Sequence, residues 1–181
     1  MYPFLAPSAP AASEVLVLEG WIPDAPMEEA LAWAATNGIQ KIWVTGGPVE
    51  TGSWLAPWKT YAEMTRARLE KMGATERFQV EAFPAPHTRK DRTLVSAMAL
   101  KTALGSGRLP AALTLASEGP HTRRSRLLFR RALGPEVVVG SLALTPSEYE
   151  PRDWWKSSAG FRSVISEAIA YPYAVFFSPD P

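Results

Sequence analysis

One polar segment, Ser117-Glu-Gly-Pro-His-Thr-Arg-Arg124, combines residue types that bind anions and transfer protons. It opens a helical pattern, where free backbone N–H groups and the helix dipole favour a negative charge. Arg123 and Arg124 add paired donors that match a phosphate or carboxylate. His121 titrates near neutral pH and is a candidate to transfer a proton. The segment therefore predicts an anion site with a proton donor; the alternative is a capped helix with a solvated arginine face.

A second polar segment, which ends in Thr93, adds positive charge and a carboxylate. Arg89 and Arg92 are candidates to hold the same anion, and Thr93 is a candidate to contact it. Asp91 is a candidate to orient the imidazole of His121. The same stretch also fits a capping box, in which Asp91 or Thr93 would only cap the next helix.

Three further groups of candidates are weaker. Thr45-Gly46-Gly47 lets backbone approach a ligand or forms a tight turn, and its spacing matches neither a dinucleotide fingerprint nor a P-loop. Glu19 and Asp24 are candidate ligand contacts, and Asp24 has the alternative role of helix cap. A nucleophilic triad of Ser117 with His and Asp is disfavoured, because Ser117 does not lie in a Gly-x-Ser-x-Gly elbow.

Composition excludes several other kinds of site. The 181 residues contain no cysteine, so neither disulfides nor a thiolate metal site can form. The two histidines lack ligand spacing, and we expect no metal site, with a site that uses scattered carboxylates as the alternative; the sequence identifies no cofactor. A net charge of +1 argues against a nucleic-acid partner. We expect an anionic small molecule as the ligand.

The elements that must position these residues alternate between short hydrophobic runs and helical patterns. The predicted strands are Glu14–Gly20, Ile39–Thr45, Arg77–Phe83, Ala111–Ala116 and Val137–Leu144. This alternation predicts a three-layer α/β/α Rossmann-like sandwich with a mostly parallel five-stranded sheet. The third strand alternates polar and apolar residues, as an edge strand does, which favours a strand order near 3-2-1-4-5.

Ligands of open parallel sheets bind beyond the carboxyl ends of the strands. Both histidines and most of the polar clusters follow predicted strands, so we expect them at one edge of the sheet. A last helix carries Phe161 and Val164 on its inward stripe, and Pro172 is expected to kink or end it. The Trp154-Trp155 pair is expected to pack this helix onto the sheet, with an exposed partner surface as the alternative.

The chain is expected to form a single domain over residues 14–181, preceded by an irregular arm at residues 1–13. The arm lacks the basic start and apolar core of a signal peptide, and no stretch is long enough for a membrane span. These absences favour a cytoplasmic location.

The motifs together resemble the YdcF/SanA/ElyC-like family, a domain of unknown function, over about residues 15–144. The matching motifs are Thr45-Gly46-Gly47, Glu63, the segment Thr88 to Thr93, and Ser117 with His121 and Arg124. The resemblance implies a Rossmann-like fold, a role in cell-envelope biogenesis and an association with the membrane or envelope. It also implies that Glu63 belongs to the site, and one member is reported to bind S-adenosylmethionine. The family's Asn-Thr-x-x-Asn segment is replaced here by Thr88-Arg-Lys-Asp-Arg-Thr93.

Two classes of function follow from these observations. The first is a phosphoester hydrolase or transferase that binds a phosphorylated small molecule, with His121 and Asp91 as the catalytic pair. The second is non-catalytic: a module that binds S-adenosylmethionine or a nucleotide, or an envelope-assembly protein. The expected ligand contacts are Glu19, Asp24, Thr45, Gly46, Gly47, Glu63, Arg89, Arg92, Thr93, Ser117, Arg123 and Arg124.

Overall fold

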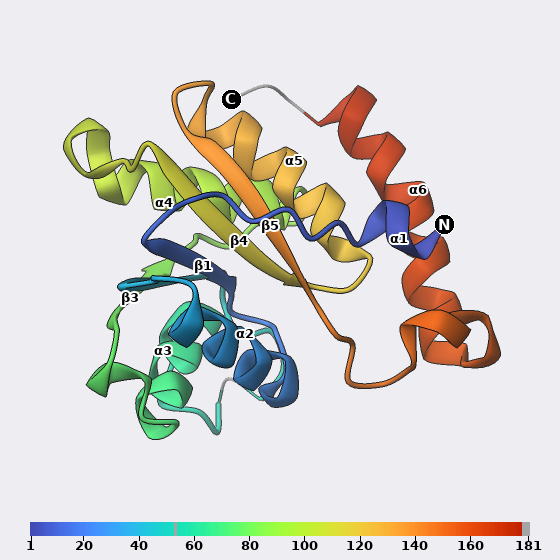
Figure 1. The fold of residues 1–181 in the computed structure, drawn as a ribbon, viewed down its shortest axis with the longest axis horizontal. Coiled ribbons are helices and arrows are strands. Elements are labelled where there is room, and N and C mark those ends of the chain that lie inside the picture. Colours follow the sequence, from blue (N-terminus) through green and yellow to red (C-terminus); the bar gives the residue numbers. More distant parts are fainter. Residues whose placement is uncertain (53, 179–181) are drawn as a thin grey trace.

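The structure is a computed structural model that describes residues 1–52 and 54–178, with the side chain of Ser106 also outside the description. Its centre is a five-stranded sheet in the order β3-β2-β1-β4-β5, and all four neighbouring strand pairs are parallel. The strands are β1 (Val15–Glu19), β2 (Lys41–Gly46), β3 (Gln79–Pro84), β4 (Ala112–Glu118) and β5 (Val138–Leu144). The predicted strand order is confirmed (Figure 1).

Helices cover both faces of the sheet and make the molecule a three-layer α/β/α sandwich (Figure 1). Alternate residues of each strand point to opposite faces, so Leu16 and Val17 belong to different cores. The first core is closed by α4 (Arg92–Arg108) and α5 (His121–Leu133), and the second by α2 (Asp24–Thr36) and α3 (Tyr61–Lys71). β1 is buried along its whole length, whereas β3 is partly exposed, as expected of an edge strand.

The C-terminal helix α6 (Ser158–Phe177) continues beyond Pro172, so Pro172 does not end it. Arg131 donates to the backbone oxygens of Ala174 and Val175, which satisfies carbonyl groups near the helix end. Phe161 is about half exposed, contrary to the predicted inward stripe. No helix among the described residues has the length and apolar character needed to cross a bilayer.

The Trp154-Trp155 pair lies in the short helix η2 (Pro151–Lys156), which packs on α6. Trp154 contacts Trp155 edge to face and stacks on Phe161. The pair therefore packs against the last helix and does not pin it to the sheet.

The N-terminal arm is more ordered than expected. It begins with a one-turn helix, α1 (Tyr2–Leu5), whose Leu5 is fully buried. An antiparallel bridge then joins Ala9 to Ser141, and Ser141 Oγ donates to the backbone oxygen of Pro7. The arm thus covers the outer edge of β5, which would otherwise be an open sheet edge.

Replacing Gly140 with alanine should detach this arm. A Cβ at position 140 would meet the backbone of Ala11 and lie 2.7 Å from the carbonyl carbon of Pro10. Overpacking of this kind costs about 1–3 kcal/mol of unfolding free energy. Thermal unfolding and limited proteolysis of the arm would measure the effect. Gly107→Ala, where the added Cβ has no atom within 4 Å, is the control; equal stability and arm protection in both variants would contradict the packing described.

Candidate functional site

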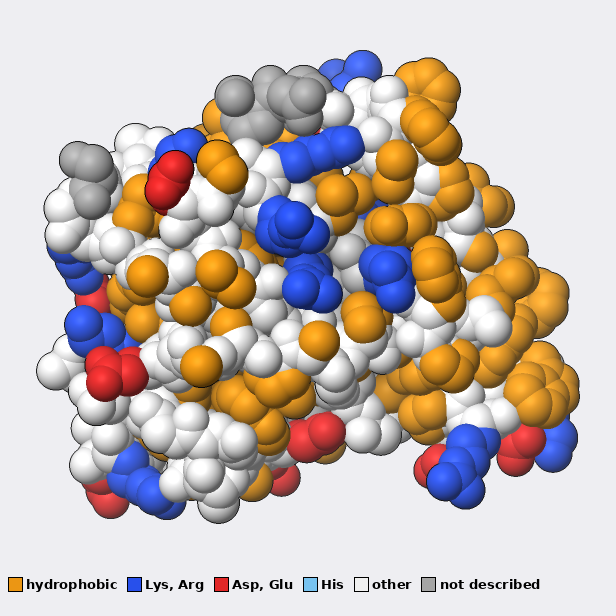
Figure 2. Space-filling model, turned by 45° about the horizontal axis from the view of Figure 1, so that its top comes forward, with side chains coloured by type: hydrophobic (Ala, Val, Ile, Leu, Met, Phe, Trp, Pro, Cys, Tyr) orange, Lys and Arg blue, Asp and Glu red, His pale blue; other side chains and the backbone are white. Residues whose placement is uncertain are grey.

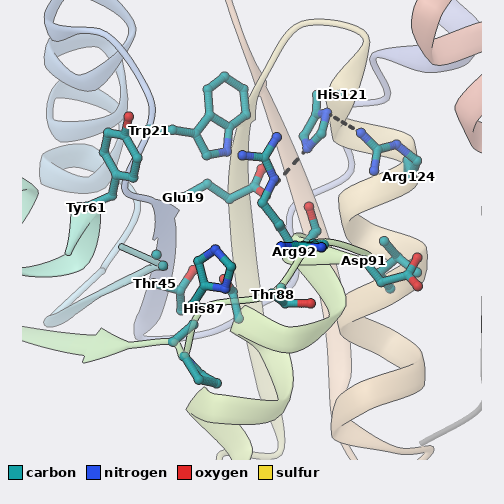
Figure 3. A pocket seen from close by; sticks show the side chains of 18 of the residues that line it. Glu19, Trp21, Thr45, Tyr61, His87, Thr88, Asp91, Arg92, His121 and Arg124 are labelled. Carbon is teal, nitrogen blue, oxygen red and sulfur yellow. Dashed lines mark hydrogen bonds and ion pairs between the residues drawn. The ribbon is translucent and has the colours of Figure 1, made fainter. Parts of the chain in front are cut away.

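A cavity of about 600 Å³ lies at the carboxyl ends of β1, β2 and β3. Its walls come from the loops that follow these strands and from the first turns of α4 and α5 (Figure 3). Residues of α6 complete the lining. This is the position expected for a ligand site in an open parallel sheet, and its size is typical of small-molecule pockets. Ten predicted site residues line it: Glu19, Thr45, Gly46, Gly47, Arg89, Asp91, Arg92, Thr93, His121 and Arg124.

Glu19, the last residue of β1, forms a buried ionic centre at the base of the cavity. Its carboxylate accepts hydrogen bonds from Ser117 Oγ at 2.5 Å and from Ser125 Oγ at 3.0 Å. His121 Nε2 lies 3.7 Å from Glu19 Oε1, close enough for ionic attraction but too far for a hydrogen bond. Burial alone would raise the pKa of Glu19, but the positive His121 and the serine hydrogen bonds outweigh it and lower the pKa. Glu19 is therefore ionised.

Glu167, on α6, holds the other side of the imidazole. Its Oε1 lies 2.7 Å from His121 Nδ1, and the guanidinium of Arg124 grips the same carboxylate through Nε at 2.8 Å and Nη2 at 2.7 Å. Arg124 Nη2 is also 2.9 Å from His121 Nδ1. When His121 is charged, Arg124 Nη2 and His121 Nδ1 are both donors and cannot bond to each other. We therefore assign the Nδ1 hydrogen bond to the Glu167 carboxylate. This arrangement leaves Nε2 buried and facing Glu19 at the base of the cavity.

These contacts set the charges of the centre. Burial would lower the pKa of His121, but the negative Glu19 and the hydrogen bond to Glu167 raise it to about 9. Burial would raise the pKa of Glu167, but Arg124 and His121 lower it to about 2. At neutral pH the site therefore holds an imidazolium between two carboxylates, and His121 is a proton donor.

Two buried polar atoms at the cavity have no hydrogen-bond partner among the described residues: His121 Nε2 and Thr45 Oγ1. Leaving a buried donor unpaired costs free energy, and such groups in native proteins call for an explanation. An acceptor atom of a ligand in the cavity would satisfy both.

The mouth of the cavity carries two arginines, Arg89 and Arg92, together with the carboxylates of Glu50 and Asp91. Arg89 is exposed and forms no hydrogen bond or ion pair with the described residues. Arg92 pairs with Glu50 at 2.9 Å, but both side chains remain mostly exposed. Figure 2 shows Lys and Arg side chains gathered near the middle of one face of the molecule. The mouth thus offers at least one cation that is not already neutralised.

The two glycines at the end of β2, Gly46 in the strand and Gly47 after it, have different structural roles. A Cβ at Gly46 would lie 2.9 Å from Tyr61 Cβ, so this glycine lets the start of α3 approach the strand. A Cβ at Gly47 would make only ordinary van der Waals contact, 3.8 Å from the backbone oxygen of Pro86, so packing does not require a glycine there. Helix packing explains the first glycine without any ligand, whereas the second remains a candidate ligand contact.

Four predicted ligand contacts lie outside the cavity lining. Asp24 forms an ion pair with Arg68, and the Glu63 carboxylate caps α3 in a capping box with Thr60. Arg123 donates to the backbone oxygen of Phe4 and lies over its ring. Each of these side chains is held by a partner that does not line the cavity.

Ser117 lies beneath the site. It is fully buried and donates to Glu19, so it is a supporting residue and not an exposed nucleophile.

Asp91 lines the cavity but does not orient His121. It is the N-terminal flanking residue of α4 in a left-handed conformation with φ 52°, and its side chain caps no backbone N–H. Its carboxylate accepts a hydrogen bond from Ser178 Oγ at 3.2 Å, and Figure 3 shows it away from the His121 ring. The predicted role of Asp91 is therefore taken by Glu167, and the predicted capping box is absent from α4.

Sequence reasoning missed Glu167, although a signal for it was present. Residues 158–177 contain one acidic side chain in a largely apolar helix, and a lone carboxylate in such a helix requires a buried partner. Trp21 and Tyr61, which also line the cavity, were missed as well. No group of His, Asp and Glu side chains in the described part of the chain is arranged to hold a metal ion.

Fold and site together define a Rossmann-like α/β/α protein with a cavity at the carboxyl ends of its strands that is lined by arginines, histidines and carboxylates. The chain matches no protein-family model and no curated protein sequence. Membership of the YdcF-like family therefore remains a prediction from the motifs.

Proposed function

We propose that the protein binds a phosphorylated small molecule in this cavity and acts as a phosphoester hydrolase or transferase. The observation that carries the proposal is the protonated His121, whose Nε2 is buried without a hydrogen-bond partner at the cavity wall. A cation held in this way can donate a hydrogen bond to a phosphate oxygen when the ligand binds. It can also protonate the leaving oxygen as the ester bond breaks.

The surrounding residues have complementary roles in this proposal. Arg89 and Arg92 attract the phosphate at the mouth, and Thr45 Oγ1 donates to one of its oxygens. A water or an alcohol attacks phosphorus, the bond to the leaving oxygen breaks, and that oxygen takes the Nε2 proton. The proton lost by the attacking oxygen returns His121 to its charged form. Glu19 and Glu167 stay ionised and keep the imidazole oriented. By resemblance to YdcF-like proteins, we place this activity in cell-envelope biogenesis.

A second candidate is a non-catalytic site for S-adenosylmethionine or a nucleotide. It is favoured by the two aromatic side chains in the cavity wall, Trp21 and Tyr61, which are suited to contact a base. The binding experiment below separates the two candidates by the ligand class.

Thermal-shift and calorimetric titrations of the wild type should show stabilisation by phosphate, pyrophosphate or phosphate esters. A ligand at 100 times its dissociation constant adds about 2.7 kcal/mol to the unfolding free energy. Arg89→Ala should weaken that binding roughly tenfold to hundredfold, because it removes a charge-assisted hydrogen bond.

Two controls make the titration specific. Arg66→Ala removes an exposed arginine of α3 that does not line the cavity. Arg123→Ala removes an arginine that was predicted to contact the ligand but bonds to the backbone of Phe4 instead. Both should bind as the wild type does. Stabilisation by S-adenosylmethionine alone would favour the second candidate, and no stabilisation by any phosphate compound would refute the first.

A further inference from the structure

The outer surface of α6 carries an uninterrupted apolar stripe. Ile169, Tyr173, Phe176 and Phe177 recur at helical spacing and are each at least half exposed. Residues 168–177 contain no charged side chain. On the side where Figure 1 places α6, Figure 2 shows a broad hydrophobic area next to the gathered Lys and Arg side chains. Exposed apolar surface on this scale marks a binding surface.

The stripe is continuous with the cavity. Ala170 and Ala174 of α6, and Ser178 directly after it, line the cavity. Each of them follows an exposed residue of the stripe in sequence. Tyr173 belongs to both surfaces, because it lines the cavity and is half exposed. Its ring stacks on Phe177, with 5.6 Å between the ring centroids. An apolar path therefore leads out of the cavity along α6.

We propose that the ligand is an anionic amphiphile, whose charged group enters the cavity beside Arg89 and His121 and whose hydrocarbon chain lies on the stripe of Ile169, Tyr173, Phe176 and Phe177. The proposal rests on the proposed phosphate site and specifies what is attached to the phosphate. A sugar or nucleoside phosphate would leave the stripe in water. An alkyl chain would cover the stripe, and the charged end of the ligand would stay beside Arg89.

The test is the affinity of one set of phosphate monoesters that differ only in chain length. Ethyl, butyl and octyl phosphate would be titrated calorimetrically into the full chain below their aggregation concentrations. Each methylene that leaves water should strengthen binding roughly two- to fourfold. The ratio of the dissociation constants of ethyl and octyl phosphate should therefore exceed about 50 in the wild type.

Two variants test where the hydrocarbon chain of the ligand lies. Phe177→Ser and Ile169→Asn alter side chains that are already exposed, so neither should disturb folding, and each should reduce the ethyl-to-octyl ratio about tenfold. Phe161→Ser is the matched control, because it removes an exposed aromatic ring near the opposite end of the same helix. The control should keep the wild-type ratio.

The outcomes separate this inference from the proposed function. If ethyl phosphate binds but chain length has no effect, the inference is wrong and the phosphate site stands. If none of the esters binds, the phosphate site itself is wrong. A ratio that persists in Phe177→Ser, or octyl phosphate binding that is unchanged in Arg89→Ala, would also overturn the inference. So would a self-associated protein that Phe177→Ser makes monomeric without any change in the ratio.

Discussion

Glutamine at His121 should lower the rate of phosphoester turnover by about 10²–10⁴-fold, the usual contribution of a positioned general acid. Glutamine keeps a hydrogen-bonding amide near Glu167 but has no proton to transfer to the leaving oxygen. Ligand affinity should fall by roughly tenfold to hundredfold, because the charge-assisted hydrogen bond from Nε2 is lost while Arg89 and Thr45 remain, so the loss of rate should be larger than the loss of affinity. Phosphate release from the ester that stabilises the wild type most strongly would measure the rate, and calorimetry would measure the affinity.

The pH profile gives an independent test of the same role. His121 acts as an acid only while protonated, and its pKa is about 9. Turnover should therefore be lost as the pH rises through about 9, and this limb should be absent from the residual activity of His121→Gln. An active enzyme whose rate is unchanged in His121→Gln, or which shows no alkaline limb, would remove His121 from the mechanism.

Glutamine at Glu167 should destabilise the folded protein by roughly 3–5 kcal/mol, because breaking a buried ion pair leaves its partner uncompensated. Arg124 and His121 both lose their counter-ion, while the nearly isosteric amide creates no cavity. For a domain of this size the melting temperature should fall by roughly 6–20 °C. The pKa of His121, followed by NMR titration, should also fall from about 9 toward its ordinary value.

The destabilisation should depend on pH in a defined direction. The raised pKa of His121 adds stability that is complete below its ordinary value of 6.5 and is lost as the pH rises through about 9. The lowered pKa of Glu167 adds stability that is complete above 4.5 and is lost as the pH falls through about 2. The difference between wild type and Glu167→Gln should therefore be largest between pH 4.5 and 6.5. Denaturant unfolding across this range would measure it.

Glu136→Gln is the matched control for this experiment. Glu136 is an exposed carboxylate without a hydrogen bond or ion pair among the described residues. Its substitution should change the unfolding free energy by less than about 0.5 kcal/mol. If Glu167→Gln proves equally mild at all pH values, the charge network assigned to α5 and α6 does not exist in solution.

The order of strands and helices could be predicted because it depends on local patterns. Hydrophobic runs such as 14–20 and 111–116 are too short for helices and too apolar for loops, so they indicate buried strands. The partly polar run at 77–83 indicated the edge position that β3 occupies. Since parallel strands need crossover helices of one hand, few arrangements remained open. The position of the cavity followed from the same rule.

Which polar side chains enter the cavity was only partly predictable. Arg123 and Arg124 are neighbours in sequence but point about 100° apart on a helix, so only one of them can face inward with His121. The spacing of His121, Arg124 and Leu128 along one stripe would have selected Arg124, which lines the cavity. Asp24 is held by Arg68, and Glu63 is held by Thr60. The rule that ligands bind beyond the carboxyl ends of strands does not predict such competing partners.

By itself, the sequence determined the fold, the edge of the sheet that carries the site, and the presence there of His121 and several arginines. These features depend on backbone geometry within a few residues, which periodicity records. Only the tertiary structure decided that Glu167 and not Asp91 holds His121, since residues 121 and 167 meet through the packing of α6 on α5. That contact depends on how α5 and α6 cross. A lone carboxylate in an apolar helix indicates that it has a buried partner but does not identify that partner.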